Sequence, residues 1–180
     1  MSALDDLLTN YRERVARPWQ DALSGPQRVW FVIYEPAQER RLRLRLHDFE
    51  VATVQAGHGW VYKDLTDAFP EWLGTHDYRE EYFAEPELMT YALADFAKEV
   101  TAKVRGVIEA ADADAVVALT GMAGFFGVAR VSALVEAVAP AVTGRLVVFF
   151  PGSYDTQSYF RLLDARDGWD YRAVPITAGS

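Results

Sequence analysis

The chain has 180 residues, of which 51% are hydrophobic, and its formal net charge at pH 7 is −8. This length fits one domain whose core buries most of the surface of the chain. The absence of cysteine excludes a disulfide framework, a thiolate zinc site and catalysis by a cysteine nucleophile. A negatively charged protein repels the phosphate backbone, so we expect no direct DNA binding by this chain alone.

The amino terminus gives no sign of targeting to a membrane. Its first 15 residues lack the basic segment and apolar core of a signal peptide, and no window contains the roughly 18 apolar residues of a membrane span. We therefore expect a soluble, cytoplasmic protein without a membrane partner.

Five strand-like runs alternate with helix-like segments. The strands are expected at 29–34, 60–65, 115–119, 146–150 and 170–175. The helices are expected at Leu4 to Val15, Arg40 to Leu46, Thr66 to Gly74, Pro86 to Ala111 and Ala129 to about Ala139. This order predicts a single-domain α/β layered fold over residues 1–180, with a mostly parallel central sheet flanked by helices. Such a fold is similar to P-loop and Rossmann-like domains, but here it lacks a nucleotide motif.

Two turns frame the carboxyl-terminal part of the chain. Pro151-Gly152 is expected to end the strand at 146–150. The segment from Asp164 to Gly168, with the sequence DARDG, is expected to form a turn before a last strand-like piece that begins at Trp169.

The glycine-rich loop from Gly121 to Gly127 lies where α/β proteins hold phosphates, between a strand and a helix. Its GxxGxxG spacing matches neither dinucleotide nor P-loop motifs, and no lysine follows to reach a phosphate. A structural loop is therefore favoured. Phe125 and Phe126 at its tip either pack under the core or anchor a partner.

Carboxylates offer a second chemical hypothesis, a Mg²⁺-dependent or nucleotide-binding enzyme module. Mg²⁺ prefers oxygen ligands, and the candidate ligands are Asp64, Asp155, Asp164 and Asp167. The simpler interpretation is that Asp164 and Asp167 make turn hydrogen bonds and pair with Arg161 or Arg166.

His58 lies between two glycines before the strand at 60–65, and it could be exposed there. A histidine bonded to backbone at a turn is the more common situation, and no triad can be assembled around His58. The three histidines also lack the spacing of a metal site, so we expect no metal or other cofactor.

Charge is distributed unevenly along the chain. Four arginines lie between Arg40 and Arg45, where a solvated helix face is favoured over a docking face for an acidic partner. The segment HDYREEYF instead places aromatic residues among acidic ones. Because interface hot spots are often aromatic and lie beside charge, this segment is a candidate contact surface. Its candidate contacts are Tyr78, Arg79, Tyr82 and Phe83.

Several segments in the same order resemble the BrxB family, which is encoded in BREX bacteriophage-exclusion operons. They are RVWFVIYEPAQERRLRLRL, GHGW, DLTDAF, HDYREEYF, GFFGVARVS, LVVFFPG and FRLLDARDGWDYRAVPI, and together they cover nearly the whole chain. The last segment contains Arg161, Asp164, Arg166, Asp167 and Trp169.

The resemblance implies a component of phage defence, whereas no complete reaction centre can be found in the sequence. We therefore expect a non-enzymatic assembly or adaptor subunit. The partner that the resemblance implies is the alkaline-phosphatase-like protein PglZ and, through it, the methyltransferase and ATPase components of the system.

Overall fold

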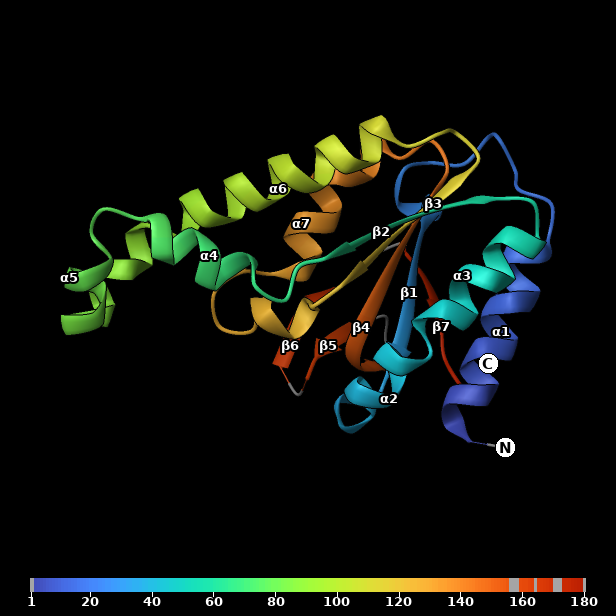
Figure 1. Cartoon of the computed structure of the whole chain (residues 1–180), viewed down its shortest axis with the longest axis horizontal. Helices are drawn as coiled ribbons and strands as arrows, with labels where there is room; N and C mark the ends of the chain where they lie inside the picture. The colour runs from blue at the N-terminus through green and yellow to red at the C-terminus, as the bar shows by residue number, and fades with distance from the viewer. Residues whose placement is uncertain (1, 156–158, 164, 170–172, 180) are drawn as a thin grey trace.

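The structure is a computed structural model that describes residues 2–155, 159–163, 165–169 and 173–179. Its centre is a parallel sheet with the strand order β2-β3-β4-β1-β7 (Figure 1). These strands are β1 (Val29–Tyr34), β2 (Gly59–Asp64), β3 (Ala115–Thr120), β4 (Arg145–Asp155) and β7 (Val174–Ile176). The predicted fold class, an α/β fold with a mostly parallel central sheet flanked by helices, is confirmed.

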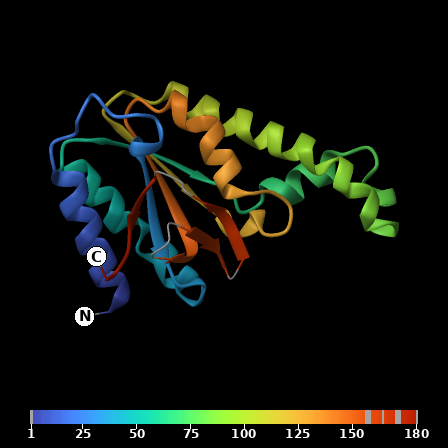
Figure 2. The ribbon, with the colours of Figure 1, turned by 180° about the vertical axis from the view of Figure 1, so that it is seen from behind.

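Helices cover both faces of the sheet (Figures 1 and 2). One face packs against α1 (Ala3–Ala16), α2 (Glu39–Leu44) and α3 (Leu46–Gln55), and the other against α4 (Ala68–Thr75), α6 (Leu93–Ala110) and α7 (Val131–Val138). The chain moves across the sheet in one direction from β1 to β2 and returns through β3 to β4. Parallel crossovers are right-handed, so the two directions require helices on opposite faces.

Short helices complete the described part of the chain. They are α5 (Arg79–Ala84) and the 3-10 helices Pro26–Arg28, Pro36–Gln38, Pro86–Tyr91, Met122–Phe125 and Ala139–Ala141. Within the described residues, none of the helices combines the length and apolar character that a membrane crossing needs.

The core consists of two apolar layers separated by the sheet. Alternate residues of β1 show the division, because Phe31 and Ile33 pack toward α6 and α7, whereas Trp30 and Val32 pack toward α1 and α3. All six residues of β1 are buried, and so are all six of β3. This two-sided burial explains why both strands are continuously apolar in the sequence.

We had expected the strand at 146–150 to end at Pro151-Gly152, but β4 continues to Asp155. Pro151 is the last residue of β4 that pairs with β1, and from Gly152 onward β4 pairs antiparallel with β5 (Tyr159–Leu162). A Cβ at Gly152 would lie 1.7 Å from the carbonyl oxygen of Arg161. Glycine therefore permits the close backbone approach that carries the strand into a second, antiparallel sheet.

The DARDG segment differs from the prediction as well. Residues Ala165–Trp169 form the strand β6, which pairs antiparallel with β5. The expected turn over Asp164 to Gly168 is therefore wrong for the residues that the structure describes. Leu163 precedes β6 with a φ of 58°, in the left-handed region, so the reversal of the chain begins before the glycine.

Three predicted boundaries shift. Pro86 opens a 3-10 helix, and α6 begins only at Leu93. The segment from Arg40 to Leu46 is helical as predicted, although it is divided between α2 and α3. Of the strand expected at 170–175, residues 170–172 lie outside the described residues, and β7 begins at Val174.

Candidate functional site

In a cluster at the carboxyl edge of the sheet, Arg43 of α2 joins the segment that follows β1 to the end of β2. Its Nε donates to Glu39 Oε1 at 2.7 Å, its Nη1 to Asp64 Oδ2 at 3.0 Å and its Nη2 to Thr66 Oγ1 at 2.6 Å. Thr66 in turn donates its backbone N–H to Asp64 Oδ1 at 2.9 Å. Partial burial acts to raise the pKa of the Asp64 carboxyl, but these hydrogen bonds outweigh it and lower that pKa to about 2.

Two tyrosines extend the cluster toward the sheet. The Tyr34 hydroxyl donates to Glu39, and burial, followed by this carboxylate neighbour, raises the pKa of Tyr34. The hydroxyls of Tyr62 and Thr120 lie 2.6 Å apart. Thr66 belongs to this cluster through its bonds to Arg43 and Asp64. It does not cap α4, whose N-cap residue is Asp67. The cluster satisfies its own charges: Glu39 and Asp64 each accept hydrogen bonds from within the chain.

The backbone of Leu65 and Thr66 also packs against the glycine-rich loop. Gly121 has a φ of 86°, and a Cβ built on it would lie 2.2 Å from the Thr66 nitrogen. A Cβ at Gly124 would lie 3.1 Å from the Thr66 carbonyl oxygen. Leu65 donates its N–H to the Thr120 carbonyl oxygen at 2.9 Å. These two glycines thus accommodate a neighbouring segment of the protein itself at the place where a phosphate would approach the loop.

The hypothesis of a carboxylate metal site involves four aspartates. Of these, the structure describes the side chain of Asp64 alone, and Asp164 lies outside the described residues. In the part of the chain that the structure describes, no three acidic or histidine side chains are placed together to hold a metal ion. Among the described residues, Asp64 therefore has no further acidic or histidine side chains placed beside it as metal ligands.

The two phenylalanines of the glycine-rich loop have different environments. Phe125 is 1% exposed and its ring lies 6.1 Å from the ring of Phe96, whereas Phe126 is 46% exposed. Phe125, which we had named as a candidate contact, is therefore part of the core and unavailable to a partner. The 3-10 helix Met122–Phe125 turns consecutive side chains in different directions, so the sequence pair FF is split.

Exposed aromatic groups gather on residues 76–91, which we call the arm. The arm comprises α5 and the 3-10 helix Pro86–Tyr91, and it projects beyond the sheet at the amino-terminal end of α6 (Figures 1 and 2). Its exposed apolar side chains are Tyr78 (61%), Phe83 (67%), Leu88 (44%) and Tyr91 (87%). Side chains of this size are seldom left in water together on one projecting element without a partner.

Acidic side chains surround these aromatic groups. Asp77, Glu80, Glu81, Glu85 and Glu87 are all exposed, and the arm contains one arginine, Arg79. The structure shows no ion pair to any of these five carboxylates within the residues it describes. Arg79 instead donates to the Gly74 carbonyl oxygen at 2.8 Å.

The arm is fixed to the body through residues that face inward. The His76 ring lies 4.9 Å from the ring of the buried Trp72 and 5.1 Å from that of Tyr82. Tyr82 is half-buried and packs against the core. Of the predicted contacts, Tyr78, Arg79 and Phe83 are therefore on the surface, whereas Tyr82 holds the arm in place.

Tyr91 and Leu88 are surface residues that the sequence analysis did not identify. Leu88 lies four residues before Ala92 and eight before Phe96, so a helix continuing from Pro86 to Ala111 would place it on the buried apolar face of α6. The 3-10 geometry of Pro86–Tyr91 breaks that register, so the two side chains turn outward. Pro86 and the acidic residues around it are the signal that could have indicated a separate element.

Other predicted site residues have structural partners. His58 Nδ1 lies 3.0 Å from the Asp114 carbonyl oxygen, and its ring stacks on Trp19 with centroids 3.5 Å apart. In the arginine-rich segment, Arg45 binds Asp48 and Asp5, while Arg40 and Arg41 are exposed. Half of these arginines thus hold the fold together.

The remaining candidates belong to the antiparallel hairpin. Arg161 is exposed on β5. Asp164 is outside the described residues, as are the side chains of Arg166, Asp167 and Trp169. The hydrogen bonds and ion pairs predicted for the side chains at 164–169 stay predictions.

Comparison with known proteins identifies a family. The model of a family described as BREX protein BrxB matches residues 75–176, which is more than half of the chain and includes the arm. No curated protein matches, and neither does any solved structure.

Proposed function

Because this chain belongs to the BrxB family, and is thereby a component of BREX phage defence, we propose that it is a cytoplasmic, non-enzymatic adaptor that binds another BREX protein through the arm. The observation that carries the proposal is the exposure of four large apolar side chains on one projecting element. Aromatic side chains are enriched at the energetic centres of interfaces.

The chemistry of the arm specifies what its partner must present. Phe83 and Tyr91 require an apolar groove, and the five carboxylates around them require a basic rim. In this family context we propose PglZ as the partner, with the methyltransferase and ATPase components joined through it. Charge at the rim accelerates association, so added salt slows the association rate more than it changes the dissociation rate.

Two contacts support an adaptor over the alternative, a Mg²⁺-dependent or nucleotide-binding enzyme module. Arg43 already binds the Asp64 carboxylate at 3.0 Å. The Thr66 backbone lies against Gly121 and Gly124, where a phosphate-binding loop needs free space. We expect calorimetry with Mg²⁺-ATP to give no binding at micromolar concentrations, and tight binding would favour the enzyme module.

The adaptor role is tested by capture of purified BREX proteins. We expect the wild-type chain to capture PglZ and a Phe83→Ala/Tyr91→Ala variant to capture at least about thirtyfold less, since loss of a hot spot costs about 2 kcal/mol or more. Leu44→Ala is the matched control, because Leu44 is a large exposed apolar residue on α2, away from the arm.

The outcomes separate the parts of the proposal. Capture of PglZ that the double variant leaves intact would contradict the role of the arm. Capture of a different BREX protein through the arm would replace the partner and keep the adaptor role. If the wild type captured no BREX protein, the adaptor role itself would be wrong.

A further inference from the structure

A second surface feature lies at the opposite end of the molecule from the arm, beside the amino ends of β1, β4 and β7. It is a cavity of about 310 Å³, and an adjoining one of about 110 Å³ shares two of its arginines. Side chains lining the larger cavity include Arg14, Arg17, Trp19, Trp30, Arg145 and Val174. A volume near 300 Å³ is at the lower end of the range for small-molecule sites.

Three arginines face this space without acidic partners. Arg145 is 4% exposed, and its guanidinium donates to backbone carbonyl oxygens, to Gly144 at 2.8 Å and to Gln20 at 3.5 Å. In the described part of the chain, no ion pair is formed by Arg14, Arg17 or Arg145. A buried cation without a counter-charge is costly, and an anion in the cavity would offset that cost.

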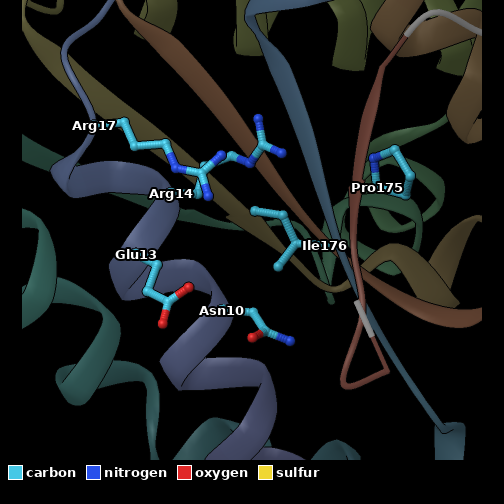
Figure 3. Close-up of a pocket in the computed structure, with 6 residues that line it drawn as sticks. All are labelled: Asn10, Glu13, Arg14, Arg17, Pro175 and Ile176. Carbon is cyan, nitrogen blue, oxygen red and sulfur yellow. The ribbon is translucent and has the colours of Figure 1, made fainter.

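The arginines converge from two sides. Figure 3 shows the side chains of Arg14 and Arg17 extending from the end of α1 into the space between that helix and β7. Burial and the charge of Arg17 lower the pKa of Arg14, while burial and the charge of Arg28 lower that of Arg145. The acidic groups nearby are Glu13, which lines the smaller cavity, and Asp21, whose charge opposes this lowering of the pKa of Arg145.

Trp19 adds an unused hydrogen-bond donor. Its indole Nε1 is buried and has no hydrogen-bond partner among the residues that the structure describes. Arg145 lies 4.6 Å from the ring centroid, and His58 stacks on the same ring. These contacts involve the ring of Trp19 and not its N–H, although buried donors are nearly always satisfied in folded proteins.

We propose that Arg14, Arg17, Trp19 and Arg145, together named the arginine pocket, bind an oxyanion, the carboxylate or phosphate group of a small solute. Guanidinium groups bind either oxyanion through charge-assisted hydrogen bonds, and Trp19 lines the same cavity beside them. The stacking of Arg145 on Trp19 holds the guanidinium in place before the anion arrives.

The test follows the indole ¹H–¹⁵N signal of Trp19 by NMR. The chain has five tryptophans, and the signal is assigned by its loss in Trp19→Phe. Sodium phosphate and sodium N-acetylglutamate are added in separate titrations at an ionic strength kept constant with sodium chloride. We expect a saturable shift with one or both, and the probe that saturates identifies the oxyanion.

Variants decide whether the shift comes from the arginine pocket. We expect Arg17→Ala and Arg145→Met each to weaken binding about tenfold or more, the effect of losing one charge-assisted contact. Arg12→Ala is the matched control, because Arg12 is exposed near Arg14 on α1 and does not line the cavity. The affinity of this variant for the anion should stay within about twofold of the wild-type affinity.

Folding is checked by circular dichroism. If Arg145→Met does not fold, Arg17→Ala decides the question, since Arg17 is exposed and its loss leaves the core intact. A linear shift without saturation for both probes would overturn the proposal, and so would an affinity that Arg17→Ala leaves unchanged.

Discussion

Replacing Gly121 by alanine tests the close contact between the glycine-rich loop and the segment after β2. Its φ of 86° costs an alanine about 1–2 kcal/mol. The new Cβ would also lie 2.2 Å from the Thr66 nitrogen and 2.7 Å from the Leu65 carbonyl carbon. Moving the Leu65-Thr66 backbone away strains two hydrogen bonds. They are the bond from the Leu65 N–H to the Thr120 carbonyl oxygen at 2.9 Å and the bond from Arg43 Nη2 to Thr66 Oγ1 at 2.6 Å, each contributing about 1 kcal/mol. Gly121→Ala should therefore lower the free energy of unfolding by about 3–4 kcal/mol.

Gly127→Ala is the matched control for this measurement. Gly127 has a φ of 77° in the same loop, but no atom of the described residues lies within 4 Å of a Cβ built on it. Gly127→Ala should lower the free energy of unfolding only by the backbone cost of its positive φ, about 1–2 kcal/mol. Urea unfolding followed by circular dichroism measures both variants against wild type. Equal destabilisation of the two would refute the close contact and reopen the loop as a site for an anion.

Two further predictions concern neighbouring side chains. Phe125→Ala should destabilise the fold by about 3–5 kcal/mol, because Phe125 is fully buried, whereas Phe126→Ala should change it by less than about 0.5 kcal/mol, and thermal denaturation of both distinguishes them. Asp64→Asn should cost about 1 kcal/mol near neutral pH after solvent screening. The pKa of Asp64 falls from 3.8 to about 2 on folding, so its contribution is present above about pH 4 and is lost as the pH falls toward 2. Unfolding free energies of wild type and Asp64→Asn should therefore converge over that range, and a constant difference would contradict the pairing with Arg43.

The strands of the parallel sheet could be predicted because their burial on both faces leaves a continuous apolar run. Val29–Tyr34 and Ala115–Thr120 show this directly. The hairpin after β4 could not be predicted, since the proline and glycine at 151 and 152 are usual signs of a turn. Here the same two residues let the strand change partners from β1 to β5.

The sequence indicated which kinds of residue form the candidate surface, but it did not indicate all of the residues that belong to it. Aromatic and acidic residues between Tyr78 and Phe83 indicated a contact surface. Which of them point outward depends on tertiary packing against the core and His76, and this separates Tyr82 from Phe83. The arginine pocket could not be predicted, because Arg14, Arg17 and Arg145 are brought together only when α1 packs beside the sheet.

Hydrogen–deuterium exchange of this chain with and without its captured BREX partner tests the role of the arm most directly. The adaptor account predicts slower exchange in residues 76–91, where the exposed aromatic groups lie, and unchanged exchange in α1 and α3 on the other face of the sheet. Protection of α1 and α3 with unchanged exchange in residues 76–91 would contradict it.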